Sequence, residues 1–377
     1  MKILLFANTD WYLFNFRLKL AERLQADGHE ILMLSPRGEY SLRLEEKGFR
    51  WQELSLSRRG LNPVVEAFTI WRLIRIYQKE QPDLVHHFTI KSVLYGSLAA
   101  RLAGIRSVVN SITGLGYVFL PGGAFKTILR GLVRIFYRIS MGCAQVIFEN
   151  EDDQDTFLRY GFIRPEDGYL IPGVGVDTDR FVPGPEPDGT PVALFASRLL
   201  WDKGVGEFVQ AARLIQKQGI QARFALAGRT DPGNPASVSM TQIEAWRDEG
   251  VIEWWGWVED MATLFQQANI VCLPSYYREG LPTVLSEAAA CGRPIVTTDH
   301  PGCRDAVKDG ETGVLVPVKD PVSLAAALGT LLGDAGLRQK MGNAGRLYAT
   351  QNLSAGHIIT RILEVYSRAL VRGTKND

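Results

Sequence analysis

Short apolar segments alternate with segments of helical spacing along this 377-residue chain, and this alternation restricts the fold more than any other feature. Residues 2–7 have the composition of a buried strand, residues 15–27 have helical spacing, and residues 30–35 again favour a strand. These three segments predict a βαβ unit. Because strands that are buried on both faces alternate with helices in doubly wound parallel sheets, we expect an α/β fold.

The alternation stops once, at residues 171–190, where proline, glycine and aspartate exclude regular structure. Before this stop, the sequence also predicts helices at 63–79 and 91–103 and strands at 83–88 and 106–112. After it, strands are predicted at 191–197, 224–228, 251–255, 270–275 and 294–299. We therefore expect two Rossmann-like domains, at residues 1–172 and 191–354, joined by a linker at 173–190. A C-terminal helix at about residues 355–377 can pack back on the first domain.

Composition excludes several classes of protein. A chain of this length with 46% hydrophobic residues can bury two cores. Its formal net charge is +1, so no overall field attracts nucleic acid or anionic lipid, and any attraction has to come from local patches. The cysteines (Cys143, Cys272, Cys291, Cys303) have no Cys-x-x-Cys spacing and no nearby histidine cluster, which is typical of reduced cytosolic thiols. From the low net charge we expect no nucleic-acid partner. No apolar run suits a signal peptide or a membrane span, so we expect a cytoplasmic protein that is soluble or peripheral to the membrane.

Two carboxylates lie on either side of a predicted helix start within residues 276–292. Pro282 suits the first position of a helix and Gly292 suits the residue after its end, which predicts a helix at about 282–291. Glu279 precedes this helix and can point at whatever group a bound phosphate carries. Glu287 lies within it, and because helical side chains lean toward the amino end, Glu287 can accept hydrogen bonds from a ribose diol.

The amino end of the same helix is a candidate anion site, because the first backbone N–H groups of a helix have no partner within it. Gly280, Leu281 and Thr283 offer such groups, and they suit a phosphate. The alternative is that both glutamates are solvated surface residues.

Two cations follow the predicted strand at 191–197, in the segment Ser-Arg-Leu-Leu-Trp-Asp-Lys-Gly. Arg198 and Lys203 flank a tight loop that ends in glycine, so both can converge on one diphosphate. Arginine and lysine are often merely solvated, and that alternative stays open. Together with the two glutamates, these cations predict a site for a nucleotide diphosphate that carries a sugar.

The order of these motifs resembles that of the retaining glycosyltransferases of family 4, which have the GT-B fold. The resemblance rests on Arg-x4-Lys-Gly at 198–204, Ala-Gly-Arg at 227–229, Gly-Trp-Val at 256–258 and Glu-x7-Glu at 279–287. Residues 173–181 also resemble a family segment, with Val174 where asparagine is common. Residues 14–17, 86–91 and 113–116 are similar to the branch that extends polyprenyl-diphosphate-linked oligosaccharides, of N-acetylgalactosaminyltransferase type.

The resemblance implies a role for each matched residue. Two Rossmann-like domains would face each other across a central cleft, the first binding the acceptor and the second the nucleotide sugar. Arg198, Lys203 and Glu279 would be catalytic, with the two cations neutralising the leaving diphosphate and the glutamate contacting the sugar. The other implied donor contacts are Glu287 at the ribose, Gly280, Leu281 and Thr283 at the phosphates, and Gly228, Trp257 and Val258 at the base.

We expect neither a metal nor another cofactor beside the UDP-sugar, because fixed cations can stabilise the departing diphosphate and no Asp-x-Asp follows a predicted strand. The expected function is transfer of a sugar, of N-acetylhexosamine type, from a UDP-sugar to a lipid-linked saccharide. Two alternatives are an enzyme like the UDP-N-acetylglucosamine 2-epimerases, which need acid-base carboxylates and histidines across the cleft, and a non-catalytic nucleotide-sugar-binding protein.

Candidate acceptor or sugar contacts lie at strand ends of the first domain. The first strand ends without the glycine-rich loop of many family members, and there Asn8 and Asp10 can line the cleft. Thr113 stands where many members have a histidine that touches the sugar. That role is either absent or taken by His86 or His87, which can equally be a structural pair.

A basic stripe runs along an otherwise apolar predicted helix at 125–139. Lys126, Arg130, Arg134 and Arg138 recur every four residues and therefore share one face. Such a helix can lie on a membrane or cradle a lipid diphosphate, although a core helix with one solvated face has the same pattern. In this context we expect a peripheral protein at the inner face of the cell membrane.

Overall fold

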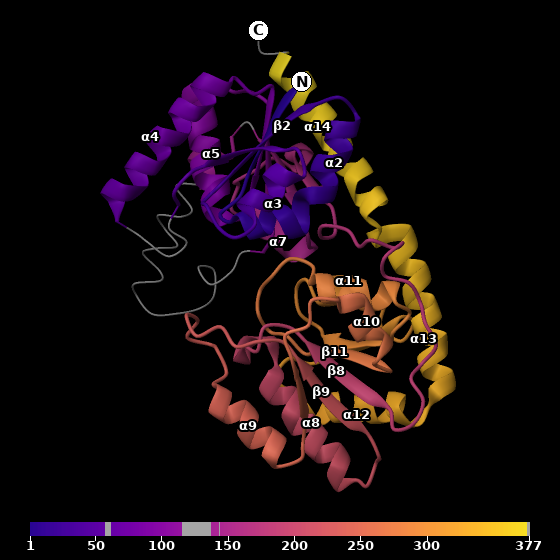
Figure 1. Cartoon of the computed structure of the whole chain (residues 1–377). Helices are drawn as coiled ribbons and strands as arrows, with labels where there is room; N and C mark the ends of the chain where they lie inside the picture. The colour runs from indigo at the N-terminus through magenta and orange to yellow at the C-terminus, as the bar shows by residue number, and fades with distance from the viewer. Residues whose placement is uncertain (57–61, 115–136, 143, 375–377) are drawn as a thin grey trace. The chain divides into compact units, whose positions relative to one another are not determined.

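The computed structural model describes residues 1–56, 62–114, 137–142 and 144–374. The chain divides into two compact units: unit 1 comprises Met1–Val174 with Ile358–Asp377, and unit 2 comprises Gly175–His357. Each unit contains one parallel sheet, which confirms the predicted α/β class (Figure 1). In the described part of the chain, no helix combines the length and the apolar character that a bilayer span requires.

Unit 1 is built on a seven-stranded sheet with the first strand near its middle. In spatial order the strands are β3 (Arg50–Glu53), β2 (Glu30–Ser35), β1 (Lys2–Phe6), β4 (Leu84–Phe88), β5 (Val108–Ile112), β6 (Gln145–Phe148) and β7 (Gly168–Leu170). The direction of progress along the sheet reverses between β1 and β4. Ligands of doubly wound sheets bind beyond the carboxyl ends of the strands at such a reversal.

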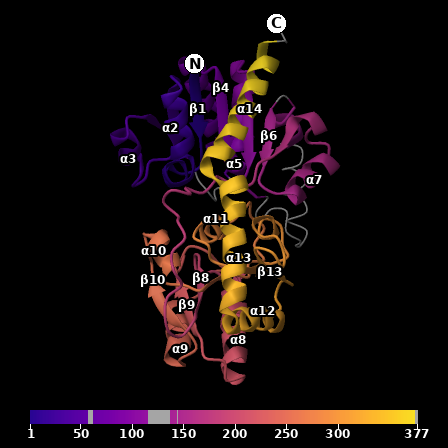
Figure 2. The same ribbon diagram turned by 90° about the vertical axis from the view of Figure 1, so that its right-hand side faces the viewer.

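Helices cover both faces of this sheet. Among the described residues, the helices of unit 1 include α1 (Asp10–Tyr12), the π-helix η1 (Leu13–Arg17), α2 (Leu18–Ala26), α3 (Ser41–Glu46), α4 (Pro63–Glu80), α5 (Ile90–Ala103), α7 (Glu151–Arg159) and α14 (Ala355–Thr374). Successive strand residues face opposite sides, so Leu4 lies in one core cluster and Leu5 in the other. Ile362 and Tyr366 of α14 join the cluster of Leu5, and Figure 2 shows this helix lying along unit 1.

Unit 2 repeats this design with six strands. In spatial order they are β10 (Glu253–Gly256), β9 (Arg223–Ala227), β8 (Val192–Ala196), β11 (Ile270–Leu273), β12 (Ile295–Thr298) and β13 (Gly313–Val316). Its helices are α8 (Val205–Lys217), α9 (Met240–Asp248), α10 (Met261–Gln266), α11 (Thr283–Ala290), α12 (Pro321–Gly333), α13 (Ala335–Tyr348) and the π-helix η6 (Ala349–Leu353), besides two short 3-10 turns. The reversal falls between β8 and β11, so the loops after these two strands border the expected ligand position.

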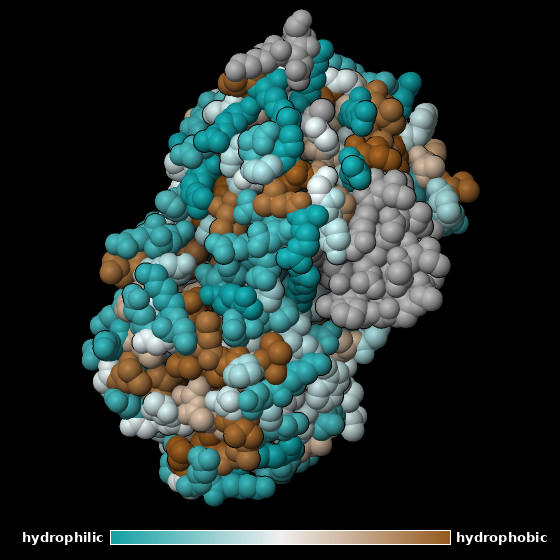
Figure 3. Space-filling view, turned by 180° about the vertical axis from the view of Figure 1, so that it is seen from behind, coloured by the Kyte–Doolittle hydropathy of each residue, from teal (hydrophilic) through white to brown (hydrophobic). Residues whose placement is uncertain are grey.

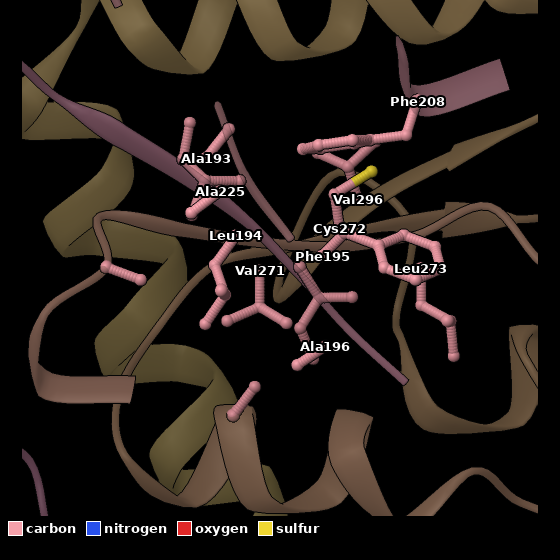
Figure 4. Close-up of a cluster of buried hydrophobic side chains, with 14 of the residues drawn as sticks. Ala193, Leu194, Phe195, Ala196, Phe208, Ala225, Val271, Cys272, Leu273 and Val296 are labelled. Carbon is pink, nitrogen blue, oxygen red and sulfur yellow. The ribbon is translucent and has the colours of Figure 1, made fainter. Parts of the chain in front are cut away.

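One hydrophobic core holds unit 2 together. Phe195 and Cys272 come from the two central strands and meet Phe208 of α8 (Figure 4). All five residues of β8 and all four of β11 are buried, as expected for strands covered on both faces. The core therefore fixes the carboxyl ends of β8 and β11, and with them the loops that follow.

Candidate functional site

Three loops of unit 2 approach one another beyond the carboxyl ends of β8, β9 and β11, and glycines allow this approach. Gly204 has a φ of +79°, and a Cβ there would lie 2.1 Å from the Pro274 carbonyl oxygen. Gly228 has a φ of +145°, and a Cβ there would lie 1.9 Å from the Ser197 carbonyl oxygen. Only glycine fits at both positions, because a side chain would be strained and would overlap backbone.

Lys203 and Glu279 form an ion pair between two of these loops. The Lys203 Nζ lies 2.5 Å from both carboxylate oxygens of Glu279. Lys203 is 6% exposed, and the Ser275 hydroxyl donates a further hydrogen bond to Glu279 over 3.3 Å. The structure thus brings together a cation and a carboxylate that the sequence predicted for one site, although they are 76 residues apart.

Arg198 has a different partner. Its Nη1 lies 3.2 Å from Asp231 Oδ2, and half of the arginine side chain is exposed. The Ser237 hydroxyl accepts the backbone N–H of Asp231 over 2.9 Å, which fixes the loop that carries the carboxylate. Asp231 was missed by the sequence analysis. Within the described residues, the two predicted phosphate-binding cations are therefore held by separate carboxylates.

Glu287 differs from Glu279, because none of the described residues donates a hydrogen bond to its carboxylate. It lies half-buried on α11. Burial raises the pKa of Glu287 to about 8, and the charge of Arg180 opposes this rise only in part. A ligand that donates hydrogen bonds to Glu287 would stabilise the ionised form of its carboxylate.

The amino end of α11 is held by a further loop. The helix begins at Thr283, with Pro282 as the residue before its first turn, one residue later than predicted. Gly302 has a φ of +85°, and a Cβ there would lie 2.0 Å from the Gly280 carbonyl oxygen. The segment around Gly302 therefore packs directly on the residues that precede the helix, of which Gly280 and Leu281 are buried.

The three residues expected near a base lie around the ends of β9 and β10. The Gly228 N–H donates to the Gly256 carbonyl over 2.7 Å, which joins the loops after both strands. Trp257 is 58% exposed and has the Arg229 guanidinium over its ring at 4.7 Å. Val258 packs partly buried on the core of unit 2. An exposed aromatic face beside a glycine turn can accept a planar ring.

The strand-end histidines of unit 1 are both held within the protein, which favours the structural alternative over a sugar contact. His86 is fully buried, with its ring nitrogens 2.7 Å from the Tyr366 hydroxyl and 2.8 Å from the Ser111 hydroxyl. His87 is also fully buried, between the Tyr77 hydroxyl and the Asn110 amide oxygen, each at 2.8 Å. Burial lowers the pKa of His87 to about 4 and that of His86 well below its usual value. Neither ring has a nitrogen available for a ligand.

Asp10 is also engaged within the protein, which gives no support to its predicted ligand contact. Its carboxylate accepts backbone N–H groups from Trp11 at 2.8 Å, Tyr40 at 2.9 Å and Ser41 at 2.8 Å. Asp10 is 5% exposed and fixes the loop that leads into α3. Asn8 and Thr113 remain partly exposed at the ends of β1 and β5.

A buried cation at the same edge of unit 1 was not singled out from the sequence. Arg17 is 2% exposed, donates to the Tyr12 hydroxyl over 2.6 Å and lies 3.6 Å from Glu149, which follows β6. It ends the π-helix η1, and π-helices are frequent at functional sites. Its place in the Phe-Asn-Phe-Arg segment was the available signal.

The basic stripe stays a prediction. Lys126, Arg130 and Arg134 lie outside the described residues. Arg138 is described and exposed, in a helical turn at 137–140.

Comparison with known proteins identifies both halves of the chain. Residues 177–348 match the family model "Glycosyl transferases group 1", and residues 2–150 match "Glycosyl transferase 4-like". The N,N'-diacetylbacillosaminyl-diphospho-undecaprenol alpha-1,3-N-acetylgalactosaminyltransferase of Campylobacter jejuni is 28% identical, over 95% of this chain and 96% of the relative. The UDP-Gal:alpha-D-GlcNAc-diphosphoundecaprenol alpha-1,3-galactosyltransferase of Escherichia coli is 23% identical, over 72% of this chain and 71% of the relative.

A solved structure supports the fold. The Anabaena protein HepE, crystallised with UDP, superposes with a TM-score of 0.78 at 20% identity, over 98% of this chain and all of HepE. Two parallel α/β sheets and the matches along both halves lead to one assignment: the chain belongs to the group 1 glycosyltransferases of family 4, a family of retaining hexosyltransferases with the GT-B fold.

Proposed function

We propose that the protein transfers an N-acetylhexosamine from a UDP-sugar to a polyprenyl-diphosphate-linked saccharide, with retention of anomeric configuration. The reaction would serve the assembly of a bacterial glycan, such as an O-antigen or a capsule. The main observation in support of a donor site in unit 2 is the contact of Lys203 with Glu279, between the loops that follow β8 and β11. The acceptor class is supported by the Campylobacter jejuni and Escherichia coli relatives, both named for diphospho-undecaprenol-linked sugars.

In this proposal Lys203 changes partner when the donor binds. Without the donor, Glu279 neutralises the buried ammonium. A diphosphate brings more negative charge to the same ammonium and displaces the carboxylate. Glu279 then becomes available to the hydroxyl groups of the sugar. As the bond between the anomeric carbon and the diphosphate oxygen breaks, Lys203 and Arg198 stabilise the charge that develops on the leaving group.

The remaining donor contacts follow from position and charge. The N–H groups at the start of α11 suit a phosphate, and Trp257 offers a face to the base. Glu287 suits the ribose diol, because two hydroxyl groups would supply the hydrogen bonds that no described residue gives its carboxylate. We infer that no metal is needed, since Lys203 and Arg198 can stabilise the negative charge of the leaving diphosphate in place of a divalent ion.

Unit 1 is proposed to bind the acceptor, at the cytoplasmic face of the membrane where a polyprenyl-linked saccharide is anchored. Asn8 and Thr113 are partly exposed at its strand ends and can contact the saccharide. The basic stripe of Lys126, Arg130, Arg134 and Arg138 is proposed to face anionic lipid or the acceptor diphosphate.

The deciding experiment incubates the protein with a panel of nucleotide sugars and short polyprenyl-diphosphate saccharides, in excess EDTA, and analyses the products by mass spectrometry. We expect UDP and an acceptor extended by one N-acetylhexosamine. An epimerised donor formed without acceptor would instead assign an enzyme like the 2-epimerases. Tight donor binding without any turnover would assign a binding protein, and activity that requires added Mg²⁺ or Mn²⁺ would overturn the metal-free mechanism.

A further inference from the structure

One face of α4 exposes large apolar side chains over its first turns. Val64 is 77% exposed, Phe68 56% and Trp71 53%, and the neighbouring Val65 is 50% exposed. Residues at spacings of four and three lie on one side of a helix, so Val64, Phe68 and Trp71 form a continuous stripe. The rings of Phe68 and Trp71 stack with their centroids 5.5 Å apart, which keeps both on this surface.

The opposite face of α4 is already used by the fold. Leu73, Ile76 and Tyr77 are buried in the core that α4 shares with α5. The exposed stripe is therefore not a core face that a small rotation of the helix could bury. In Figure 1 the first turns of α4 extend beyond α5, and the reverse view of Figure 3 shows hydrophobic residues, in brown, at the surface of the corresponding edge.

Exposed cations follow the apolar stripe toward the C-terminal end of α4. Arg75 follows Trp71 by four residues and is exposed, as is Lys79, and Arg72 beside them is partly exposed. The two acidic residues of the helix are neutralised elsewhere: Glu66 pairs with Lys91 at 2.7 Å, and Glu80 pairs with Lys2 and Arg50, both at 3.2 Å. The exposed side of α4 is thus apolar with an adjoining excess of positive charge.

We propose that this face of α4 docks on the surface of an anionic lipid bilayer, with Phe68 and Trp71 at the level of the acyl-chain boundary and Arg75 and Lys79 among the headgroups. Aromatic side chains with a neighbouring cationic segment are the composition that favours this interface. The inference deepens the proposed function and rests on it for the presence of a membrane near the acceptor, but it concerns a surface that the basic stripe does not include.

A protein partner fits the same surface less well. A second copy of this chain would bring the same cations to the contact, and the carboxylates of α4 are already paired. Like charges that approach without counter-charges oppose association. An anionic bilayer supplies both the apolar layer and the counter-charge.

The test measures binding of the full chain to sedimented vesicles of neutral lipid and of neutral lipid mixed with phosphatidylglycerol. We expect binding to the anionic vesicles that weakens as salt is raised. Phe68→Ala with Trp71→Ala should weaken it by at least about tenfold, because two large side chains no longer leave water. Arg75→Gln with Lys79→Gln should weaken it by roughly tenfold at low salt and by less at high salt.

The matched control changes the same kinds of residue on α13 of unit 2. Leu347 is 58% exposed there and Lys340 is exposed, so Leu347→Ala with Lys340→Gln should leave vesicle binding unchanged. Brominated lipid should quench tryptophan fluorescence in the wild type and quench it less in Trp71→Phe. Circular dichroism checks that every variant is folded.

Unchanged vesicle binding of both α4 variants, or absence of binding by the wild type, would overturn the proposal. So would a concentration-dependent dimer that is lost in Phe68→Ala with Trp71→Ala while vesicle binding persists. Transfer to a short, water-soluble acceptor is measured on the same samples. Transfer without vesicle binding would reject the α4 surface alone, whereas vesicle binding through α4 without transfer would reject the proposed function alone.

Discussion

Polar side chains at or beyond the carboxyl ends of the strands have different hydrogen-bond partners in the two units. In unit 1, His86 and His87 are fully buried and each ring nitrogen has a partner from the protein itself. In unit 2, Glu287 has no hydrogen-bond donor among the described residues, and Lys203 pairs with the Glu279 carboxylate, which we propose that a bound diphosphate displaces. The contrast teaches that position at a strand end marks a candidate, and unsatisfied or exchangeable polar groups mark a binding site.

The largest expected effect comes from removing the cations of unit 2. Lys203→Ala and Arg198→Ala should each lower turnover by about two orders of magnitude or more, because each removes stabilisation of the departing diphosphate. Arg213→Ala is the control, since Arg213 also pairs with a carboxylate, Glu249 at 2.5 Å, on the surface of unit 2. Steady-state transfer assays on folded variants measure the effect. Turnover near that of the control in both variants would show that the cations of unit 2 do not contact the leaving diphosphate.

The histidines of unit 1 should show the reverse behaviour. His87→Ala should lower the free energy of unfolding by about 3 kcal/mol, because it opens a cavity and removes the buried partner of the Tyr77 hydroxyl, while the Asn110 amide oxygen keeps the Ser97 hydroxyl as a donor. The affinity for UDP and the turnover of the folded variant should stay within about threefold of wild type. Chemical denaturation and transfer assays on the same preparation separate the two effects. A normal stability with a hundredfold loss of turnover would return His87 to the active site.

The raised pKa of Glu287 predicts how binding and stability depend on pH. A ribose diol donates hydrogen bonds to the ionised carboxylate, so the affinity for UDP should rise by up to about tenfold per pH unit below pH 8 and then level off. Without bound nucleotide, the stability of the fold has the opposite pH dependence. The contribution of Glu287 to the free energy of unfolding is complete below pH 4.5, the pKa of the unfolded state, and it is lost as pH rises through about 8.

Calorimetric titrations with UDP at pH 6, 7 and 8 test this for the wild type and for Glu287→Gln. The comparison of the two cancels the titration of the ligand phosphates. The wild type should release more protons on binding than the variant at pH 7. Equal pH dependence in both proteins would show that Glu287 does not meet the nucleotide.

The smallest effect per residue concerns the basic stripe. Replacing Lys126, Arg130, Arg134 and Arg138 by glutamine should weaken binding to anionic vesicles, by up to about fivefold for each cation that faces lipid, and the loss should shrink as salt is raised. Transfer to a short, water-soluble acceptor should persist. Loss of this transfer with vesicle binding intact would place the stripe at the acceptor diphosphate.

Much of the fold follows from the sequence because buried parallel strands are short apolar runs. The strands predicted at 191–197 and 270–275 correspond to β8 and β11. β3 was missed because Arg50–Glu53 is an edge strand with polar residues and a half-buried face. The first predicted helix was also imprecise, because residues 10–17 form α1 and the π-helix η1 before α2 begins.

The site was predicted less completely, and the physical reason is sequence separation. The spacing of Glu279 and Glu287 is local, so the sequence could display it. The pairing of Arg198 with Asp231 joins residues 33 positions apart, and no local sequence pattern predicts such a contact. The role of His86 depends on Tyr366, which is 280 residues away, so the sequence could not decide between a structural and a ligand-binding histidine.

The most direct test of the donor site compares Glu279→Gln with Glu287→Gln, using UDP affinity from calorimetry and transfer rate from the same folded samples. Glu287 would bind ribose equally in ground state and transition state, so Glu287→Gln should mainly weaken UDP binding. Glu279 would meet the sugar as positive charge develops at the anomeric carbon, so Glu279→Gln should mainly lower turnover while UDP still binds. Loss of UDP binding in Glu279→Gln together with normal UDP binding in Glu287→Gln would contradict this placement of the two carboxylates along the donor.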